Sequence, residues 1–460
     1  MVEKQREFFL SGATLNLDTR KKQLLALRKL FVDECDALTN AVYMDLRRRP
    51  ELTHSIEIGC VIVEIDYILE HLKDWASPKH VEKTFLSLLD TPLIVKDPYG
   101  VVLIISPWNY PINLLFMPLI PAIAAGNTVI LKPSELAPNT TSLISELITK
   151  YFDPQYLAVV CGGVNETTEL LKERFDHIFY TGGPKVAKSI MVAAARNLTP
   201  VTFELGGKCP VVVEEDANIE LSAKRIAWGK WMNCGQTCLA PDYILVKSTV
   251  KAKLIAALQS TVVEFYGEVP QKSEDYSRII NQMHFDRLNA ILEKSAASIV
   301  YKGGEPDRGD LFIPPVILEA SPDDPVMQEE IFGPLLPVVT VEGLSEAIDF
   351  IKSREKPLAA YIFTKNDKDA ERFYTETSSG AVCVNDVIMH LTVDTLPFGG
   401  VGNSGMGRYR GKFGFDTFTH EKAVLKRAFF TERLIEFVSV TFFCKLYLSY
   451  VANILLKKGL

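Results

Sequence analysis

The strongest constraint on the fold is a regular alternation, between residues 100 and 205, of short apolar runs with stretches long enough for helices. Several runs end on Gly, Pro or Ser, and they cover residues 101–105, 128–131, 157–160, 177–180 and 201–205. Strands buried on both faces are continuously apolar, and parallel strands are joined by helical crossovers. The pattern therefore predicts βαβ units and a parallel sheet with helices on both faces.

A second α/β stretch follows from Cys209 to about Asn385, with strands expected at residues 210–213, 243–246 and 338–341. A chain of 460 residues is too long for one hydrophobic core. We therefore expect two large lobes, joined tightly near Gly206 and Gly207.

The first hundred residues predict helices. Apolar side chains recur at helical spacing over residues 20–42 and again over residues 58–72, and Pro78 stops the second stretch. Residues 84–96 are apolar but contain Pro92, which suits an edge strand better than a central one because proline has no N–H to donate.

Composition excludes several classes of protein. The chain is 47% hydrophobic and 23% charged, ordinary globular values that exclude a mainly disordered, collagen-like or coiled-coil chain. A net charge of −7 argues against nucleic acid as a partner. The first ten residues mix both charge signs without an apolar segment, so we expect no secretory signal and reduced thiols. Neither the eight cysteines nor the seven histidines show a metal-ligand spacing, so no metal site is expected.

The segment NCGQTC, residues 233–238, offers a candidate nucleophile. Cys238 follows a Gly-Gln-Thr turn, where the backbone can approach a substrate closely and offer its N–H groups. A thiolate there would add to a carbonyl carbon. A buried structural cysteine is the alternative, and this motif alone leaves the two interpretations about even. Cys234, four residues earlier, is interpreted as a bystander.

Two polar residues at the ends of apolar strands could serve that nucleophile. Glu204, in FELGGK, ends a buried strand, where a carboxylate is costly unless it is paired or functional. Beside the thiol it would take a proton from the nucleophile or from a hydrolytic water, and the alternative is an N-capping or salt-bridged carboxylate. Asn109, in SPWNYP, is a neutral donor suited to an oxyanion hole, and the alternative is an Asx turn between two prolines.

Two other segments stand out. EIFGP, residues 330–334, places a carboxylate, Glu330, two residues before an aromatic face, Phe332. The alternative there is a loop carboxylate above a packed phenylalanine. The basic run at residues 47–49 is interpreted as a solvated charge cluster.

Taken together these segments indicate a family. PWNYP, LKPSE, FELGGK, NCGQTCLAPDY, EEIFGP and LPFGGVGNSGMG occur in the order of the aldehyde dehydrogenase superfamily, which the chain resembles over roughly residues 5 to 425. The resemblance is greatest to its class 3, fatty-aldehyde branch. It implies an α/β fold with a Rossmann-type NAD(P)-binding domain, a catalytic domain and a bridging element used in oligomerisation, with a homodimer expected. The expected bounds are 1–84 and 98–206 for the first, 207–403 for the second, and 85–97 and 404–427 for the third.

The resemblance also implies roles for the residues singled out above. Cys238 would form a thiohemiacetal with an aldehyde, its oxyanion held by the Asn109 side chain and the Cys238 backbone N–H. After hydride transfer to the nicotinamide, Glu204 would activate the water that hydrolyses the thioester. The residues implied at the cofactor are Trp108, Lys132, Glu135, Gly182, Gly183, Glu330 and Phe332.

Within that cofactor site the resemblance distinguishes separate contacts. Glu330 and Phe332 would contact the nicotinamide ribose, while Lys132 and Glu135 would reach the adenosine ribose. Because Glu135 would accept from the ribose hydroxyls and repel a 2′-phosphate, NAD is expected to be preferred or at least accepted, with NADP also allowed by Lys132. His284 falls where the branch has a histidine near the cofactor.

The phosphate-binding turn departs from the family pattern of two glycines five residues apart. Gly182 and Gly183 keep the close backbone approach, and Pro184 suits a first helical turn. Ala187 replaces the second glycine and adds a methyl group where the helix meets the sheet or the cofactor. We expect cofactor binding to survive this change.

The last 33 residues, 428–460, are expected to form a hydrophobic tail. Residues 437–456 contain few polar side chains, and twenty helical residues span about 30 Å, the thickness of a bilayer core. The tail is expected to span a membrane or to lie in its interface, and packing on the protein itself or on a dimer partner is the alternative. Catalytic lobes on the cytosolic side of the endoplasmic reticulum are expected, with a soluble cytoplasmic protein as the alternative.

Three functions remain open from the sequence. The leading one is NAD(P)-dependent oxidation of hydrophobic, medium- to long-chain or aromatic, aldehydes to carboxylic acids. A cofactor-free esterase using Cys238 and a non-catalytic membrane-bound structural or binding protein are the alternatives.

Overall fold

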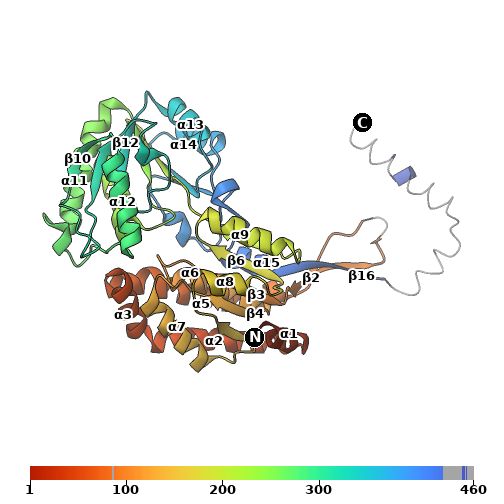
Figure 1. Ribbon diagram of the computed structural model, residues 1–460. Helices are drawn as coiled ribbons and strands as arrows, with labels where there is room; N and C mark the ends of the chain where they lie inside the picture. Colours follow the sequence, from red (N-terminus) through yellow and green to blue (C-terminus); the bar gives the residue numbers. More distant parts are fainter. Residues whose placement is uncertain (85–86, 428–447, 451, 453–460) are drawn as a thin grey trace. The chain divides into compact units, whose positions relative to one another are not determined.

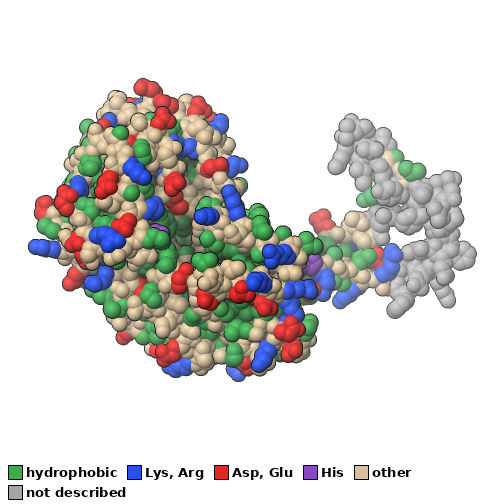
Figure 2. All heavy atoms as spheres, in the orientation of Figure 1, with side chains coloured by type: hydrophobic (Ala, Val, Ile, Leu, Met, Phe, Trp, Pro, Cys, Tyr) green, Lys and Arg blue, Asp and Glu red, His purple; other side chains and the backbone are tan. Residues whose placement is uncertain are grey.

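The computed structural model describes residues 1–84, 87–427, 448–450 and 452, shown in colour in Figure 1. They divide into two compact units. One unit consists of Met1–Trp75 and Pro98–Thr419, and the other of Ala76–Asp97 with the described residues after Thr419. On the face of Figure 2, Lys and Arg side chains are interspersed with Asp and Glu.

The first half of the larger unit is built on a six-stranded sheet in the order β15-β7-β6-β3-β4-β5, in which β15 is antiparallel to β7 and the other pairs are parallel. The strands are β3 Val101–Ile105, β4 Thr128–Lys132, β5 Leu157–Val159, β6 His177–Thr181, β7 Val201–Glu204 and β15 Gly405–Met406. Every residue of β3, β4 and β6 is buried. The alternation of apolar runs and helices predicted for this region is therefore confirmed.

Helices follow these strands and cover the sheet. The crossovers are α6 Asn113–Ala125, α7 Pro138–Tyr151, α8 Val164–Leu170 and α9 Pro184–Ala195. The amino-terminal helices are α1 Val2–Leu10, α2 Leu17–Asp33, α3 Cys35–Leu46, α4 Pro50–Thr53, a π-helical turn at His54–Ile58 and α5 Gly59–Ala76. In Figure 1, α2 packs on α6 and α3 packs on α7. Since α5 ends just before Ser77-Pro78, the predicted helix stop is confirmed.

The second half of the same unit is built on a seven-stranded sheet in the order β10-β11-β12-β9-β8-β13-β14, antiparallel only at β10–β11. The strands are β8 Pro210–Val213, β9 Tyr243–Val246, β10 Ser298–Lys302, β11 Val316–Glu319, β12 Leu335–Thr340, β13 Ala359–Phe363 and β14 Ala381–Val384. The helices are α10 Ile219–Trp231, α11 Ser248–Tyr266, α12 Gln282–Lys294, α13 Leu344–Lys352 and α14 Asp367–Glu376. The later helix α15 Gly411–Thr417 packs on α6 of the first half. The chain passes from the first sheet to the second between β7 and β8, through Gly206 and Gly207.

The smaller unit contains a three-stranded sheet of β1 Lys79–His80, β2 Thr91–Pro98 and β16 Thr419–Lys426. The expectation of an edge strand here was wrong, because β2 lies between β1 and β16. Pro92 is tolerated as the second residue of the strand, where its carbonyl accepts a hydrogen bond from Val81 N at 3.3 Å. Ion pairs of Lys96 with Glu421 at 2.7 Å and of Lys422 with Asp97 at 2.5 Å join β2 to β16.

The hydrophobic tail falls almost wholly outside the described residues, so the structure leaves it as a prediction. Among the residues that are described, none belongs to a helix both long enough and apolar enough to cross a bilayer.

Candidate active site

The thiol and the carboxylate singled out in the sequence meet in the structure. Glu204 is the last residue of β7, and Cys238 lies in the loop between α10 and β9. Cys238 Sγ donates a hydrogen bond to Glu204 Oε1 at 3.2 Å. Within the described part of the chain, Glu204 Oε2 is buried without a hydrogen-bond partner. One oxygen of the carboxylate thus holds the thiol proton while the other is free to accept a proton from elsewhere.

Burial sets the protonation of both groups. It raises the pKa of Glu204 to about 7 and, together with the nearby Glu204 carboxylate, raises the pKa of the Cys238 thiol well above its ordinary value. Cys238 is therefore a protonated thiol at neutral pH and needs a base to become a nucleophile. Glu204, half ionised near pH 7, is the base in contact with it.

The loop before Cys238 is held in an unusual backbone conformation. Asn233, Cys234 and Gly235 all have positive φ, at 53°, 56° and 72°. A Cβ on Gly235 would lie 2.2 Å from the carbonyl oxygen of Gly333, so no side chain fits there. The sequence interpretation of this glycine needs correction, because the close approach is to another backbone segment rather than to a substrate.

Cys234, the neighbouring cysteine, has no part in this chemistry. It is fully buried, and burial raises its pKa to about 12. Its Sγ faces the Ile313 carbonyl at 3.9 Å. The prediction that it is a bystander agrees with this position.

Asn109 is bound to the same loop. It is 2% exposed, and its Nδ2 donates to the Gln236 carbonyl at 3.0 Å, which occupies one of the two amide hydrogens. The Asn109 carbonyl accepts from Asn233 Nδ2 at 3.0 Å, and Tyr110 Oη lies 2.7 Å from Thr237 Oγ1. These bonds hold the Asn109 amide against the loop that carries Cys238. They leave the second amide hydrogen of Asn109 for a developing oxyanion.

A buried ion pair between Arg48 and Glu57 supports the loop that carries Asn109. Arg48 and Glu57 are both fully buried and form an ion pair. Arg48 Nη1 donates to the Asn109 carbonyl at 3.0 Å, and Glu57 Oε2 accepts from the N–H groups of Ile112 and Asn113 at 2.8 and 2.9 Å. Glu57 therefore caps the start of α6, where a carboxylate is favoured by the helix dipole.

The basic run at residues 47–49 was interpreted as solvated, and for Arg48 this was wrong. Its guanidinium also donates to Thr53 Oγ1 at 3.2 Å and lies 4.9 Å from the centre of the Tyr110 ring. No local pattern indicated this burial, because the partners Glu57 and Asn109 meet Arg48 only after folding. A buried Arg paired with Glu is the functional element that sequence reasoning missed.

Two cavities have the Cys238–Glu204 pair in their linings. The smaller, of about 260 Å³, is called here the glycine-lined cavity, and besides the pair its lining includes Trp108, Asn109, Gly182, Gly183, Gly206, His284, Glu330 and Phe332. The larger, of about 600 Å³, is called the apolar cavity, and its lining includes Tyr110, Met117, Trp228, Met232, Leu239 and Ile388. The linings have three residues in common, namely Leu114, Glu204 and Cys238.

Glu330 and Phe332 form one wall of the glycine-lined cavity. A Cβ on Gly206 would lie 2.2 Å from Glu330 Oε2, so this glycine lets the carboxylate approach the end of β7. Burial, with the charge of Asp242, raises the pKa of Glu330 to about 8. Phe332, with φ of 48°, meets the Trp108 ring edge to face at 5.5 Å between centroids.

The residues at the end of β6 line the same cavity. Gly182 and Gly183 line the cavity, and a Cβ on Gly183 would meet no atom within 4 Å, so the start of α9 is open. Ala187 is 3% exposed and belongs to the hydrophobic core, so its methyl group faces the sheet rather than the cavity. His284 lines the cavity too, with its ring 4.9 Å from that of Trp108.

Lys132 and Glu135 lie apart from that lining. Lys132 ends β4 and is 3% exposed, and its Nζ contacts Glu135 Oε2 at 3.0 Å and the Pro133 carbonyl at 3.1 Å. Glu135 also approaches Gly163, which follows β5. The two residues therefore lie at the carboxyl ends of neighbouring parallel strands, where dinucleotides bind in open α/β sheets. Their adenosine role stays a prediction.

Comparison with known proteins identifies the family of the chain. A profile of the aldehyde dehydrogenase family matches residues 1–424. The chain is 49% identical to aldehyde dehydrogenase family 3 member A2 of Macaca fascicularis over 93% of this chain and 88% of that protein. It is 48% identical to the dimeric NADP-preferring aldehyde dehydrogenase of Rattus norvegicus, over 94% of this chain and 95% of that protein.

Solved structures give the same result. The substrate-bound state of Staphylococcus aureus AldH superposes with a TM-score of 0.91 at 45% identity, covering 93% of both chains. A betaine aldehyde dehydrogenase of the same organism, in complex with NAD+, superposes with a TM-score of 0.83 at 28% identity, covering 92% of this chain and 86% of that one. The chain belongs to the aldehyde dehydrogenase family, in its class 3 branch.

Proposed function

We propose that the protein oxidises hydrophobic aldehydes to carboxylic acids through Cys238, with NAD(P) as the hydride acceptor. One observation carries the proposal. The hydrogen-bonded Cys238–Glu204 pair lies where a glycine-lined cavity and an apolar cavity meet. A thiol placed there can react with a substrate in one cavity while a second molecule occupies the other.

The glycine-lined cavity fits a dinucleotide. Gly183 opens the amino terminus of α9, whose free N–H groups and dipole favour phosphate. Glu330 offers carboxylate oxygens to ribose hydroxyls, and Phe332 and Trp108 offer ring faces beside it. Bound NAD(P) supplies the hydride acceptor that converts the aldehyde adduct of Cys238 into a thioester.

The protein's own groups account for the proton transfers. Glu204 Oε1 takes the proton of Cys238 as Sγ adds to the aldehyde carbon, and the free Asn109 amide hydrogen stabilises the resulting oxyanion. Once Glu204 has released that proton to solvent, its unpartnered Oε2 accepts a proton from the water that attacks the thioester, and the protonated carboxyl passes this second proton to the Cys238 thiolate. The carboxylic acid leaves, and Cys238 regains its proton.

The apolar cavity defines the kind of aldehyde. Leu114, Met117, Met232, Leu239 and Ile388 present hydrocarbon surface next to the thiol. Burying an alkyl chain or a benzene ring against that surface is favourable, whereas a charged chain would lose its hydration. Medium- to long-chain and aromatic aldehydes are therefore the proposed substrates.

One assay tests the proposal directly. Purified protein is incubated with a panel of aldehydes and either NAD or NADP, and reduction of the nucleotide is followed by absorbance. Turnover that rises with the apolar character of the aldehyde is expected, and Cys238→Ser should abolish it because a hydroxyl is a far weaker nucleophile. Ester hydrolysis without nucleotide reduction would support the esterase alternative, and no turnover of either kind would support the non-catalytic one.

Cofactor preference follows from the Lys132–Glu135 pair. Glu135, paired with Lys132 at 3.0 Å, can accept from the ribose hydroxyls, so we propose that NAD is used. Lys132 can offset repulsion of a 2′-phosphate, so NADP is accepted as well. A related protein is named NADP-preferring, which agrees with dual use in this branch.

We also propose a homodimer attached to the endoplasmic reticulum by residues 437–456, with the catalytic unit in the cytosol. The name of one relative includes the word dimeric, which supports the oligomeric state. The support for attachment is the apolar sequence itself, with its preceding basic residues suited to an anionic leaflet.

A further inference from the structure

A third cavity lies beside the apolar one, outside the site described above. It has a volume of about 610 Å³ and is called here the outer groove. Ser55, Trp228 and Met232 line both the outer groove and the apolar cavity. The two spaces are therefore neighbours at these three side chains.

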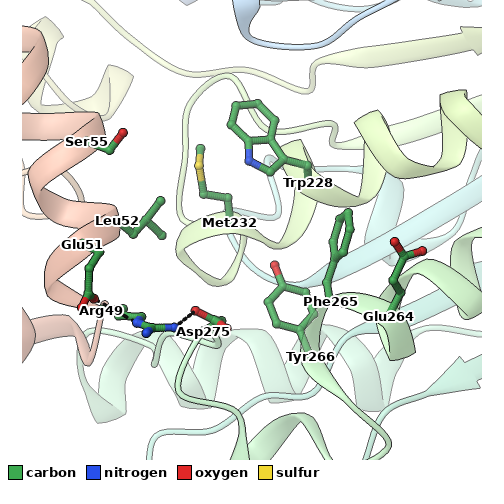
Figure 3. Close-up of a pocket in the computed structure, with 10 residues that line it drawn as sticks. All are labelled: Arg49, Glu51, Leu52, Ser55, Trp228, Met232, Glu264, Phe265, Tyr266 and Asp275. Carbon is green, nitrogen blue, oxygen red and sulfur yellow. Dashed lines mark hydrogen bonds and ion pairs between the residues drawn. The ribbon is translucent and has the colours of Figure 1, made fainter.

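The walls of the outer groove are largely hydrocarbon. Leu52 projects from α4 on one side, and Phe265 and Tyr266 project from the end of α11 on the other, with Met232 between them (Figure 3). Trp228, on α10, is 36% exposed. Apolar surface left open to water in this way is unfavourable unless a ligand covers it.

The charged residues at the rim define the end group that fits. Arg49 is already paired with Glu51 and with Asp275, each at 2.9 Å, and the second pair is drawn in Figure 3. Glu264, also at the rim, is paired with Lys224 at 2.7 Å. Three carboxylates thus share two cations, which leaves a net negative charge at the rim. An anionic end group would therefore be repelled.

We infer that the outer groove binds the distal end of a long, uncharged aldehyde whose reacting end occupies the apolar cavity. The inference rests on the proposed function. A chain too long for the apolar cavity passes Ser55, Trp228 and Met232 and lies against Leu52 and Phe265. Each methylene that it buries there adds about fourfold to binding. The groove thereby selects long neutral aldehydes over long aldehydes that carry a terminal carboxylate.

A chain-length series tests the inference. The full-length protein is assayed with straight-chain aldehydes from hexanal to hexadecanal, and the ratio of kcat/KM for hexadecanal to that for hexanal is measured. Phe265→Gln and Leu52→Gln should each lower this ratio about tenfold, because the distal methylenes lose an apolar wall. Tyr374→Gln is the matched control, since Tyr374 is an exposed aromatic side chain on α14 outside all three cavities, and the ratio should stay at the wild-type value.

A charge reversal at the rim tests the inference without changing the apolar wall. Glu264 is exposed, so Glu264→Lys should fold, and it places a positive charge at the rim. It should raise kcat/KM for hexadecanal bearing a terminal carboxylate about threefold, while the value for hexadecanal itself does not rise. The effect should disappear at high salt.

The outcomes separate this inference from the proposed function. Turnover of hexanal with an unchanged chain-length ratio in both glutamine variants would overturn the outer groove and leave the proposed function standing. The same conclusion would follow if Glu264→Lys left the carboxylated aldehyde unaffected. Absence of hexanal turnover in the wild-type protein would instead overturn the proposed function.

Discussion

At the scale of single residues, the division of work between the two oxygens of Glu204 is the most informative feature. Oε1 accepts from Cys238 Sγ, and Oε2 is buried without a partner among the described residues. With its pKa raised to about 7 by burial, the carboxyl can both take and return a proton at neutral pH. The same side chain is therefore suited to the first and last proton transfers of the reaction.

Glu204→Gln should slow both hydride transfer and thioester hydrolysis, because the variant lacks the base for the Cys238 thiol as well as for the attacking water. At neutral pH, stopped-flow absorbance should show neither a rapid burst of reduced nucleotide nor wild-type steady turnover. The wild-type steady rate should rise with pH through about 7, because the base must lose its proton to act, and the variant should lack this limb. A rapid burst followed by a slow steady rate would show instead that another base deprotonates Cys238 and that Glu204 serves the attacking water alone.

Arg48 lends itself to a second prediction at this scale. Arg48→Lys keeps a charge beside Glu57 but loses the fork that reaches both Glu57 and the Asn109 carbonyl. We expect kcat to fall about tenfold as Asn109 becomes less well placed, with KM for the nucleotide unchanged. In Arg48→Met, kcat should fall further. This variant should also lose about 3–5 kcal/mol of unfolding free energy, because it leaves a buried carboxylate unpaired.

The exposed neighbour supplies the control for Arg48. Arg47→Met removes a charge of the same kind from the same short run, and both kcat and the melting temperature should stay at wild-type values. Equal losses in kcat for Arg47 and Arg48 variants would show that general charge, and not the contact with Asn109, is responsible.

At the scale of secondary-structure elements, the strands were the most predictable part of the molecule. β3, β8 and β9 begin and end where the apolar runs do, because a strand buried on both faces is apolar along its whole length. Pro92 was misplaced at a sheet edge, because its effect depends on where in the strand it lies. Helix bounds were less predictable, because the helical spacing over residues 20–42 is divided between α2 and α3 at Glu34, and the end of α5 before Ser77-Pro78 is the bound that matched its local signal.

Contacts between distant elements were not predictable in this way. Glu204, Cys238 and Asn109 were found through motifs, whereas the burial of Arg48 depends on partners that the π-helical turn at His54–Ile58 and the Asn109 loop bring in only on folding. The outer groove likewise combines α4 with the end of α11, about 200 residues later, and no spacing along one segment indicates it.

Ala187 provides the prediction at this scale. It replaces a family glycine within α9, and its methyl group is buried in the core. Ala187→Gly should lower the free energy of unfolding by about 1–2 kcal/mol, through lost helix propensity and lost burial. The increase in melting temperature caused by saturating NAD should be unchanged, because the methyl group does not face the cavity. A larger increase would show that the alanine obstructs the cofactor.

At the scale of the whole molecule, the proposed anchor and the catalytic residues are separate in sequence. Every residue assigned here to catalysis or cofactor binding precedes Arg427, and the apolar stretch at residues 437–456 follows it. The full chain should sediment with membranes and resist alkaline carbonate extraction. A chain ending at Arg427 should remain in the supernatant and still oxidise short aldehydes. Full-length protein found in the supernatant would mean that the tail packs on protein instead.

The linings that meet at Cys238 have an evolutionary consequence. Only Leu114, Glu204 and Cys238 are common to the glycine-lined and apolar cavities. Mutations elsewhere in the lining of the apolar cavity can thus change which aldehydes are accepted without altering the glycine-lined cavity. After gene duplication, one copy is free to drift toward new aldehydes while its nucleotide requirement is inherited intact. The side chains from α5 and α10 are where descendants of one ancestor should differ most.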